Sequence, residues 1–365
     1  MSTADGDVSS KGVADAGGLS RRDALRVGAT VGLAGVGAVG YWLLYDKTGD
    51  RGLPRHQAHR LENYLADVYD RAVSESLPRL SIARGQDVAK MVSAALQPYG
   101  GMAGFVRSGD VVLVKPNVGF ASSPSIGATT SPAVVEAVVR ECIAAGASRV
   151  IVADNPIATP ATAFQKSKIQ QAAQRAGAEV MLPSQPDFVN VEVRPGKPDP
   201  LRGESLGKWP IFWKPIAQAD KVIGLPTVKD HNLCSASISM KNWYGLLGGR
   251  RDQFHQAIDN IVSDLGLVIS PTLIIADGTR VLMRSGPTGG RRSDLKPAHT
   301  LVAALDQVAC DAWCYENLLE RDPARLKYLE LAEAKFGQDP ALKRFGQRDW
   351  KAYKTQGLIK ETNIS

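Results

Sequence analysis

The feature that most constrains the fold is an alternation of short apolar runs with longer amphipathic segments, which extends from Leu80 to Leu319. The runs have the length of buried strands, and the segments between them carry apolar residues at helical spacing. Strands that alternate with helices are typical of a mostly parallel sheet flanked by helices. The sequence therefore predicts an α/β fold in which ligands bind outside the carboxyl ends of the strands.

The runs and segments place the elements along the chain. The predicted strands cover 80–83, 111–114, 149–153, 179–182, 222–225, 272–276 and 300–305. The predicted helices cover 87–96, 132–145, a segment ending near 176, 256–267 and 307–319. Ser131 is expected to cap the helix that begins at Pro132. Residues 183–215 are rich in proline and tryptophan, so we expect an insertion or a sheet-edge feature there.

Five of the predicted strands are followed at once by polar or charged residues. These are Lys115 and Asn117, Asp154, Lys229 and His231, Asp277, and Asp306. Because the carboxyl ends of parallel strands lie at one edge of the sheet, these side chains are expected to converge there. Helix capping explains an Asp or Asn in such a place, whereas Lys and His are not preferred cap residues.

The stretch 222–255 holds the densest set of chargeable residues, because His231 is followed by Lys241, Asn242 and His255. The two histidines are candidates for a general base or for a metal ligand. The chain has neither an H-x-H nor an H-x-x-x-H pair, so we rank acid–base chemistry or contact with an anion above metal binding. A solvated loop with surface lysines is the alternative interpretation.

Two Gly-Gly-Arg-Arg segments occur, at 248–251 and at 289–292, and the second follows shortly after Gly286. Glycine lets backbone N–H groups approach an anion, and an arginine fork binds phosphate or carboxylate at two points. Arg250 and Arg291 are therefore candidate ligand contacts, and a surface turn with solvated arginines explains them equally well. The chain has no Walker motif and no G-x-S-x-G, which disfavours an α/β-hydrolase.

The beginning of the chain resembles an export signal. Ser20-Arg21-Arg22-Asp23-Ala24-Leu25 precedes an apolar, glycine-rich segment that runs from Val27 to Tyr45, as in a twin-arginine signal. We expect the twin-arginine machinery to export the protein to the periplasm or to the outer face of the cytoplasmic membrane. The apolar segment anchors it there if it stays uncleaved. A G-x-G-x-x-G at 35–40 lacks the preceding strand that dinucleotide binding requires.

The predicted organisation has four parts. Residues 1–45 form a disordered tail with the signal, 46–78 a linker and a helix, 79–316 the α/β domain, and 317–365 a helical extension. The net charge is +7, and residues 1–45 contribute nothing to it. The folded part is therefore basic, which favours an anionic partner. Aromatic residues make up 6% and do not interleave with Lys and Arg, so no nucleic acid is expected.

Taken in order, the strand-end motifs resemble domain-of-unknown-function family 362, over residues 80–316. The motifs are Val114-Lys115-Pro116-Asn117, Thr130-Ser131-Pro132-Ala133-Val134-Val135, Asp154 with Pro156, Pro226-Thr227-Val228-Lys229-Asp230-His231, Lys241-Asn242-Trp243-Tyr244-Gly245, His255, Asp277-Gly278, Gly286-Pro287 and Asp306-Gln307-Val308-Ala309-Cys310-Asp311. Many family members carry repeated C-x-x-C-x-x-C clusters, which implies electron transfer. This chain has four cysteines and no such cluster, so a redox role needs another cofactor or a partner.

These observations predict a protein that binds a small anionic ligand in a basic pocket at the strand ends. Three functions stay open: an enzyme that uses Lys and His for acid–base chemistry, a non-catalytic, membrane-associated solute-binding or redox-accessory protein, or, third, a protein of metal-dependent redox chemistry or hydrolysis. The predicted catalytic residues are Lys229, His231, Lys241 and His255. The predicted ligand contacts are Lys115, Asn117, Thr130, Asp154, Asn242, Arg250, Asp277, Gly286, Arg291 and Asp306. No metal site is predicted, and the cofactor is left unknown.

Overall fold

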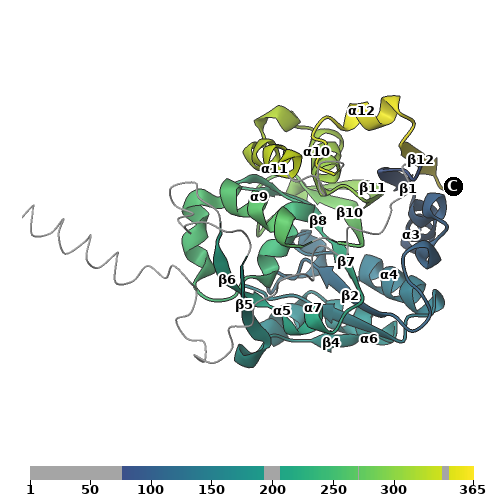
Figure 1. Cartoon of the computed structure of the whole chain (residues 1–365). Helices are drawn as coiled ribbons and strands as arrows, with labels where there is room; N and C mark the ends of the chain where they lie inside the picture. Colours follow the sequence, from purple (N-terminus) through teal and green to yellow (C-terminus); the bar gives the residue numbers. More distant parts are fainter. Residues whose placement is uncertain (1–75, 193–205, 270, 339–344) are drawn as a thin grey trace, which may run out of the picture. The chain divides into compact units, whose positions relative to one another are not determined.

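A computed structural model describes residues 76–192, 206–269, 271–338 and 345–365 (Figure 1). The predicted export signal and most of the linker that follows it lie outside these residues. The strands are β1 (Leu80–Arg84), β2 (Val111–Pro116), β3 (Arg149–Ala153), β4 (Glu179–Met181), β5 (Phe188–Glu192), β6 (Lys208–Phe212), β7 (Lys221–Leu225), β8 (Thr227–His231), β9 (Ser235–Ser237), β10 (Leu273–Leu282), β11 (Leu295–Ala304) and β12 (Ile359–Asn363).

Ten of the strands in the described residues form one mixed sheet in the order β12-β1-β11-β10-β7-β2-β3-β4, with β8 beside β10 and β9 beside β8. The run from β10 through β7, β2 and β3 to β4 is parallel throughout. Strand β11 runs antiparallel to both of its neighbours, and β9 runs antiparallel to β8. The predicted α/β fold with a mostly parallel sheet is therefore confirmed.

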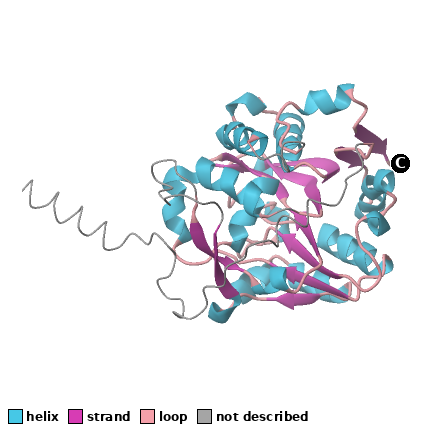
Figure 2. Ribbon diagram, viewed as in Figure 1, coloured by secondary structure: helices cyan, strands magenta, loops and turns pink. Residues whose placement is uncertain are grey.

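Helices cover both faces of this sheet (Figure 2). They are α3 (Val88–Leu96), α4 (Pro132–Ala144), α5 (Pro160–Lys166), α6 (Ile169–Arg175), α7 (Lys214–Ala217), α8 (Ser239–Asn242), α9 (Ile258–Val268), α10 (Gln307–Asn317), α11 (Lys327–Gly337) and α12 (Trp350–Thr355). Because side chains alternate along a strand, Val112 and Val114 of β2 join one apolar cluster and Leu113 joins the other. Helices α3, α4 and α6 complete the first cluster, and α8 to α11 complete the second.

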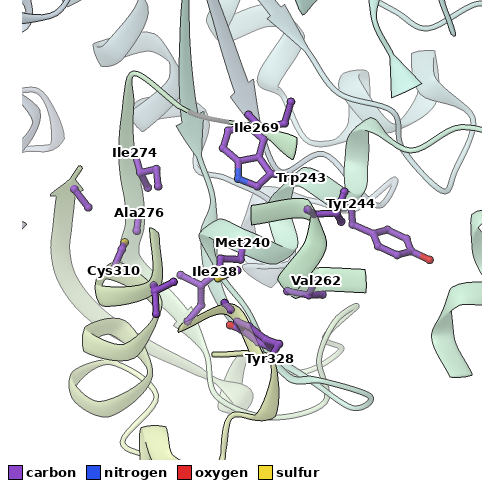
Figure 3. Packing of buried hydrophobic residues seen from close by; sticks show 14 of the residues in the cluster. Ile238, Met240, Trp243, Tyr244, Val262, Ile269, Ile274, Ala276, Cys310 and Tyr328 are labelled. Carbon is purple, nitrogen blue, oxygen red and sulfur yellow. The ribbon is translucent and has the colours of Figure 1, made fainter. Parts of the chain in front are cut away.

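The second cluster places the short helix α8 between α9 and α10. Met240 of α8 packs among Val262 of α9, Cys310 of α10 and Tyr328 of α11 (Figure 3). Tyr244, four residues after Met240, belongs to the same cluster, but its side chain points away from the centre of the cluster (Figure 3). This packing fixes α8 beside β7.

The segment 183–215, expected as an insertion or a sheet-edge feature, contributes the separate antiparallel pair β5–β6. Three expectations about the elements need correction. Residues 227–231, expected as a loop after the strand 222–225, form strand β8. The extension 317–365 is not only helical, because the chain ends in β12, which pairs in parallel with β1. Ser131 precedes α4 as predicted, but its side chain makes no capping hydrogen bond.

Asp306 follows a strand that runs antiparallel to β10, so it lies at the edge opposite to the other predicted residues. Its expected convergence with them is therefore wrong, and the capping alternative is confirmed. The fully buried carboxylate accepts five hydrogen bonds of 2.8 to 3.0 Å. The donors are the N–H groups of Val308, Ala309, Gly346 and Gln347 and the hydroxyl of Tyr353.

We predict that Asp306→Ala lowers the free energy of unfolding by about 3 to 5 kcal/mol, since it leaves several buried donors without an acceptor. Urea unfolding measures the loss. An Asp306→Ala protein that unfolds at the same urea concentration as the native protein would contradict this structural role.

Candidate functional site

The strand that carries Lys229 and His231 continues β7 beyond a proline. Strand β10 runs beside both halves, since Leu273 pairs with Ile223 and Asp277 pairs with Thr227. Pro226 has no N–H group, but its carbonyl accepts a 2.8 Å hydrogen bond from Asp277 N. The sheet edge is therefore extended by one short strand on the carboxyl side of β7.

Side-chain alternation along β8 separates its charged residues. Lys229 and His231 are two positions apart and face the same side, whereas Asp230 faces the other. The Asp230 carboxylate accepts from Gly286 N at 2.9 Å and forms a 2.7 Å ion pair with Arg321. The spacing K-x-H thus directs the side chains of Lys229 and His231 to one side of β8. On the other side, Asp230 holds the strand to Gly286 and Arg321.

A cavity of about 300 Å³ opens where Lys229 and His231 point, and we call it the strand-end cavity. It is lined by residues of β8, β9 and α8 and by the segments that follow β2, β3, β8, α8 and β10. Half of the predicted site residues meet here: Asn117, Asp154, Lys229, His231, Lys241, Asn242 and His255. The predicted convergence of residues that are far apart in sequence is therefore present for this set.

A buried ion pair between Lys115 and Asp154 lies at the cavity, with Asp154 in its lining and Lys115 behind it. Lys115 Nζ lies 2.6 Å from Asp154 Oδ1 and also donates to Pro116 O at 2.9 Å and to Asn242 Oδ1 at 3.2 Å. The second Asp154 oxygen accepts from Val118 N at 2.7 Å. Burial lowers the pKa of Lys115, and the neighbouring Asp154 acts in the opposite direction. The only carboxylate among the predicted cavity residues is thus already engaged.

Gly245 of the K-N-x-x-G motif packs directly on this ion pair. A Cβ atom at this position would lie 2.1 Å from Asp154 Oδ1 and 2.8 Å from Lys115 Nζ. The Gly245 carbonyl also accepts a 2.8 Å hydrogen bond from Asn155 N. Close approach of the backbone to a buried salt bridge explains the glycine, without any need for an unusual φ angle.

Lys229 is fully buried, and two acceptors orient its ammonium group. Its Nζ donates to Ala128 O at 2.5 Å and to Asn117 Oδ1 at 3.2 Å, and it lies 5.1 Å from the Phe120 ring centroid. Burial, reinforced by the charge of Lys241, lowers the pKa of Lys229 to about 7. Near neutral pH this amine therefore exchanges between its charged and neutral forms.

Lys241 lies on α8 with its Nζ 3.6 Å from the centroid of the Tyr244 ring. Within the described part of the chain, its ammonium group has no hydrogen-bond acceptor. Burial, the largest influence, lowers the pKa of Lys241 to about 8, and the nearby Arg251 adds to the effect. Lys241 is thus the cavity lysine that the protein leaves without a polar partner.

The start of α8 is held by a carboxylate from α10. Asp311 accepts from Ser239 N at 2.8 Å and from Met240 N at 3.2 Å, and the hydroxyl of Tyr328 donates to it at 3.0 Å. Burial raises the pKa of Asp311 to about 6. Asp311 is the last residue of the D-x-V-A-x-D motif, so that motif supports the cavity wall rather than lining it.

The two histidines of the cavity differ in their surroundings. His231 is buried, and burial followed by the charges of Lys241 and Lys229 lowers its pKa to about 3. Its Nδ1 accepts a 3.2 Å hydrogen bond from Leu233 N, so the neutral ring carries its proton on Nε2. His255 is less buried and stacks on Tyr244 with a centroid distance of 5.9 Å, and burial lowers its pKa as well.

The remaining predicted contacts do not line the cavity. Thr130 and Asp277 are buried supports: Thr130 Oγ1 donates to Leu225 O at 2.6 Å, and Asp277 Oδ2 accepts from Ser131 N at 2.7 Å. Gly286 adjoins the cavity through Pro287, which lines it. Arg250 and Arg291 are exposed, so the structure places neither beside the ligand-facing lysines.

Sequence reasoning missed Arg251, the neighbour of Arg250, which lines the cavity. Its guanidinium donates to the carbonyl oxygens of Asn155, Tyr244 and Leu247 at 2.8 to 3.1 Å. The signal that could have found it is the same Gly-Gly-Arg-Arg segment, whose second arginine turns inward. In the described residues no group of three His, Cys, Asp or Glu side chains is arranged to hold a metal ion.

We predict that Lys241→Met stabilises the ligand-free protein by about 3 kcal/mol at pH 6, since a pKa unit corresponds to about 1.4 kcal/mol. The folded-state pKa of Lys241 lies below its unfolded value, so protonation opposes folding below pH 8 and this penalty shrinks as the pH rises toward 10.5. Urea unfolding at pH 6 and pH 9.5 measures the difference. Lys360→Met, in exposed β12, is the control. A Lys241→Met advantage that grows with pH would contradict the assignment.

Comparisons with known proteins place these features in a family. The family model described as Domain of unknown function (DUF362) matches residues 112–316, which is more than half of the chain. The thylakoid-associated protein sll1697 of Synechocystis sp. (strain ATCC 27184 / PCC 6803 / Kazusa) is 29% identical over 275 residues, which cover 73% of this chain and 80% of that protein.

A solved structure, the lactate racemase apoprotein from Thermoanaerobacterium thermosaccharolyticum, matches 60% of this chain and 54% of that chain. The TM-score is 0.30, at 12% sequence identity. This chain thus spans little more than half of the racemase. Together with the ordered strand-end motifs and the cavity they form, the family match shows that the chain belongs to the DUF362 family.

Proposed function

We propose that the strand-end cavity binds a small anionic ligand and that the protein carries out acid–base chemistry on it. The observation that carries this proposal is an imbalance of charge in and beside the cavity. Lys115, Lys229 and Lys241 are buried cations, Arg251 is a half-buried one, and Asp154 is the carboxylate that faces them. Buried charges are costly unless they are paired, so an anionic ligand supplies the missing negative charge.

The hydrogen-bonding geometry assigns different roles to the polar groups. Lys241 contacts the ligand, because its ammonium group has no other acceptor within the described residues. Lys229 is held in place by Asn117 and Ala128 and retains a third donor for the ligand. His231 stays neutral and offers its Nε2–H as a hydrogen-bond donor.

Lys229 is the group best suited to exchange a proton with the ligand. A general acid or base is most effective when its pKa lies near the working pH, and the pKa of Lys229 is about 7. His231 is less suited, because its pKa of about 3 keeps it neutral. The proton transfer expected of a histidine is therefore assigned to the neighbouring lysine. If a bound ligand is always recovered chemically unchanged, the acid–base function is excluded and the non-catalytic binding function stands.

We predict that Lys241→Met weakens sulfate and malonate binding by about ten- to a hundredfold, because a charge-assisted hydrogen bond contributes roughly 1.5 to 3 kcal/mol. Titration calorimetry on the full chain measures the affinity. Lys360→Met removes an exposed lysine and is expected to bind as the native protein does. Sulfate affinity should also fall as the pH rises from 6 to 9, since Lys229 and Lys241 lose their charge near pH 7 and 8. Equal affinity in both variants, or at both pH values, would overturn the anion site.

We further propose export through the twin-arginine route, with the protein held at the outer face of the membrane by its N-terminal segment. The support is the motif around Arg21 and Arg22, together with a relative that is named as thylakoid-associated. Residues 1–75 are outside the described part of the chain. Within the described part, none of the helices has the length and apolar character needed to span a bilayer.

We predict that replacing Arg21 and Arg22 by lysine keeps the protein inside the cytoplasm of a bacterial host with a twin-arginine translocase. Fractionation and immunoblotting of the full chain measure the distribution. Arg26→Lys, a few residues downstream, is the matched control and is expected to behave as the native signal. Identical distributions of the native and double-lysine proteins would rule out this route.

A further inference from the structure

A second cavity of about 550 Å³ adjoins the strand-end cavity, and we call it the outer cavity. Five residues line both cavities and form their common wall: Asn155, Ile157, Tyr244, Arg251 and His255. A ligand that lies along these five residues contacts both cavities. The two cavities are therefore adjacent and share part of their lining.

The lining of the outer cavity has a different chemistry. Beyond the common wall it consists largely of apolar surface from Pro156, Pro160, Pro183 and Phe188, with the carboxylate of Asp252 among the polar exceptions. No lysine lines it, and Arg251, its one arginine, already donates to three backbone carbonyls. An anionic group is disfavoured in this cavity, whereas an apolar group finds matching surface.

Two exposed apolar side chains lie at the strand-end cavity. Ile157 is 64% exposed and Leu233 is 48% exposed, and among the described residues the one other large apolar side chain with comparable exposure is Ile143. Ile157 belongs to the common wall, and Leu233 lines the strand-end cavity. Apolar surface left uncovered at the boundary between a basic cavity and an apolar one indicates a ligand that has both kinds of group.

The size of the site agrees with such a ligand. A water molecule occupies about 30 Å³, so the strand-end cavity alone holds the equivalent of roughly ten waters. An inorganic anion would fill only part of this space and none of the outer cavity. A ligand that fills both must carry an organic extension on its anionic group.

Building on the proposed anion site, we propose that the ligand is an organic carboxylate or phosphate monoester with an extended apolar arm. The anionic group lies against Lys229 and Lys241. The arm passes Ile157 and Tyr244 into the outer cavity.

The test measures affinity along two series of probes, the n-alkyl phosphates and the n-alkanoates, from one carbon to about six. Titration calorimetry on the full chain should show affinity rising by about two- to fourfold per methylene, as expected for burial of an alkyl chain. The series with the higher affinity identifies the anionic group. An affinity that does not change with chain length in either series would overturn the apolar arm.

A variant that fills the outer cavity locates the arm. Gln185 is exposed and lines the outer cavity but not the strand-end cavity, so Gln185→Trp should remove the gain with chain length and leave methyl phosphate and acetate unaffected. Gln356→Trp, at an exposed position after α12, is the matched control and should keep the native gain. A gain that persists in Gln185→Trp would place the arm elsewhere and overturn the proposal.

The outcomes separate this inference from the function on which it rests. If the shortest anions bind and Lys241→Met weakens their binding, but longer probes bind no better, the anion site stands and the apolar arm is refuted. If neither series binds at any length, the anion site is refuted together with the arm. Length-dependent binding that both Lys241→Met and Gln185→Trp weaken supports the two cavities as one site.

Discussion

The buried ion pair between Lys115 and Asp154 is the interaction on which the arrangement of this site depends. It joins the ends of β2 and β3, and Asn242 ties α8 to the same lysine. It also uses the carboxylate that would otherwise neutralise the lysines of the cavity. Burial is the main factor that disfavours the protonated forms of the nearby Lys229 and Lys241, and the positive charges around them add to it. The Lys115–Asp154 ion pair thus holds the elements of the site together and also leaves its other lysines without a carboxylate partner.

Much of the architecture follows from sequence patterns that are local. The strands at 111–114, 149–153 and 222–225 and the helices at 87–96 and 132–145 are found within a few residues of their predicted bounds. The convergence of Lys229, His231 and Asp154 also follows from the sequence, because a parallel sheet brings its carboxyl ends to one edge. Residues whose position depends only on strand direction within the parallel part of the sheet are therefore predictable.

The misplaced residues depend on information that no local pattern holds. Asp306 lies at the far edge because β11 is antiparallel, and apolar periodicity does not distinguish the two directions of a strand. Arg251 rather than Arg250 turns inward on the segment that follows α8, whose Gly248 is hydrogen-bonded to Pro210 and Trp209 of the distant strand β6. The five acceptor contacts of Asp306 and the supporting role of Asp311 arise from packing between distant segments, so only the assembled fold reveals them.

The two lysines that face the cavity, Lys229 and Lys241, are carried by different kinds of element. Lys229 is carried by the sheet, whereas Lys241 is carried by a single helical turn that Asp311 and the apolar layer of α9, α10 and α11 hold in position. Substitutions in that layer can shift Lys241 while the strand-borne groups stay where they are. Changes in the core, far from the cavity lining, can therefore alter the arrangement of charge within the cavity.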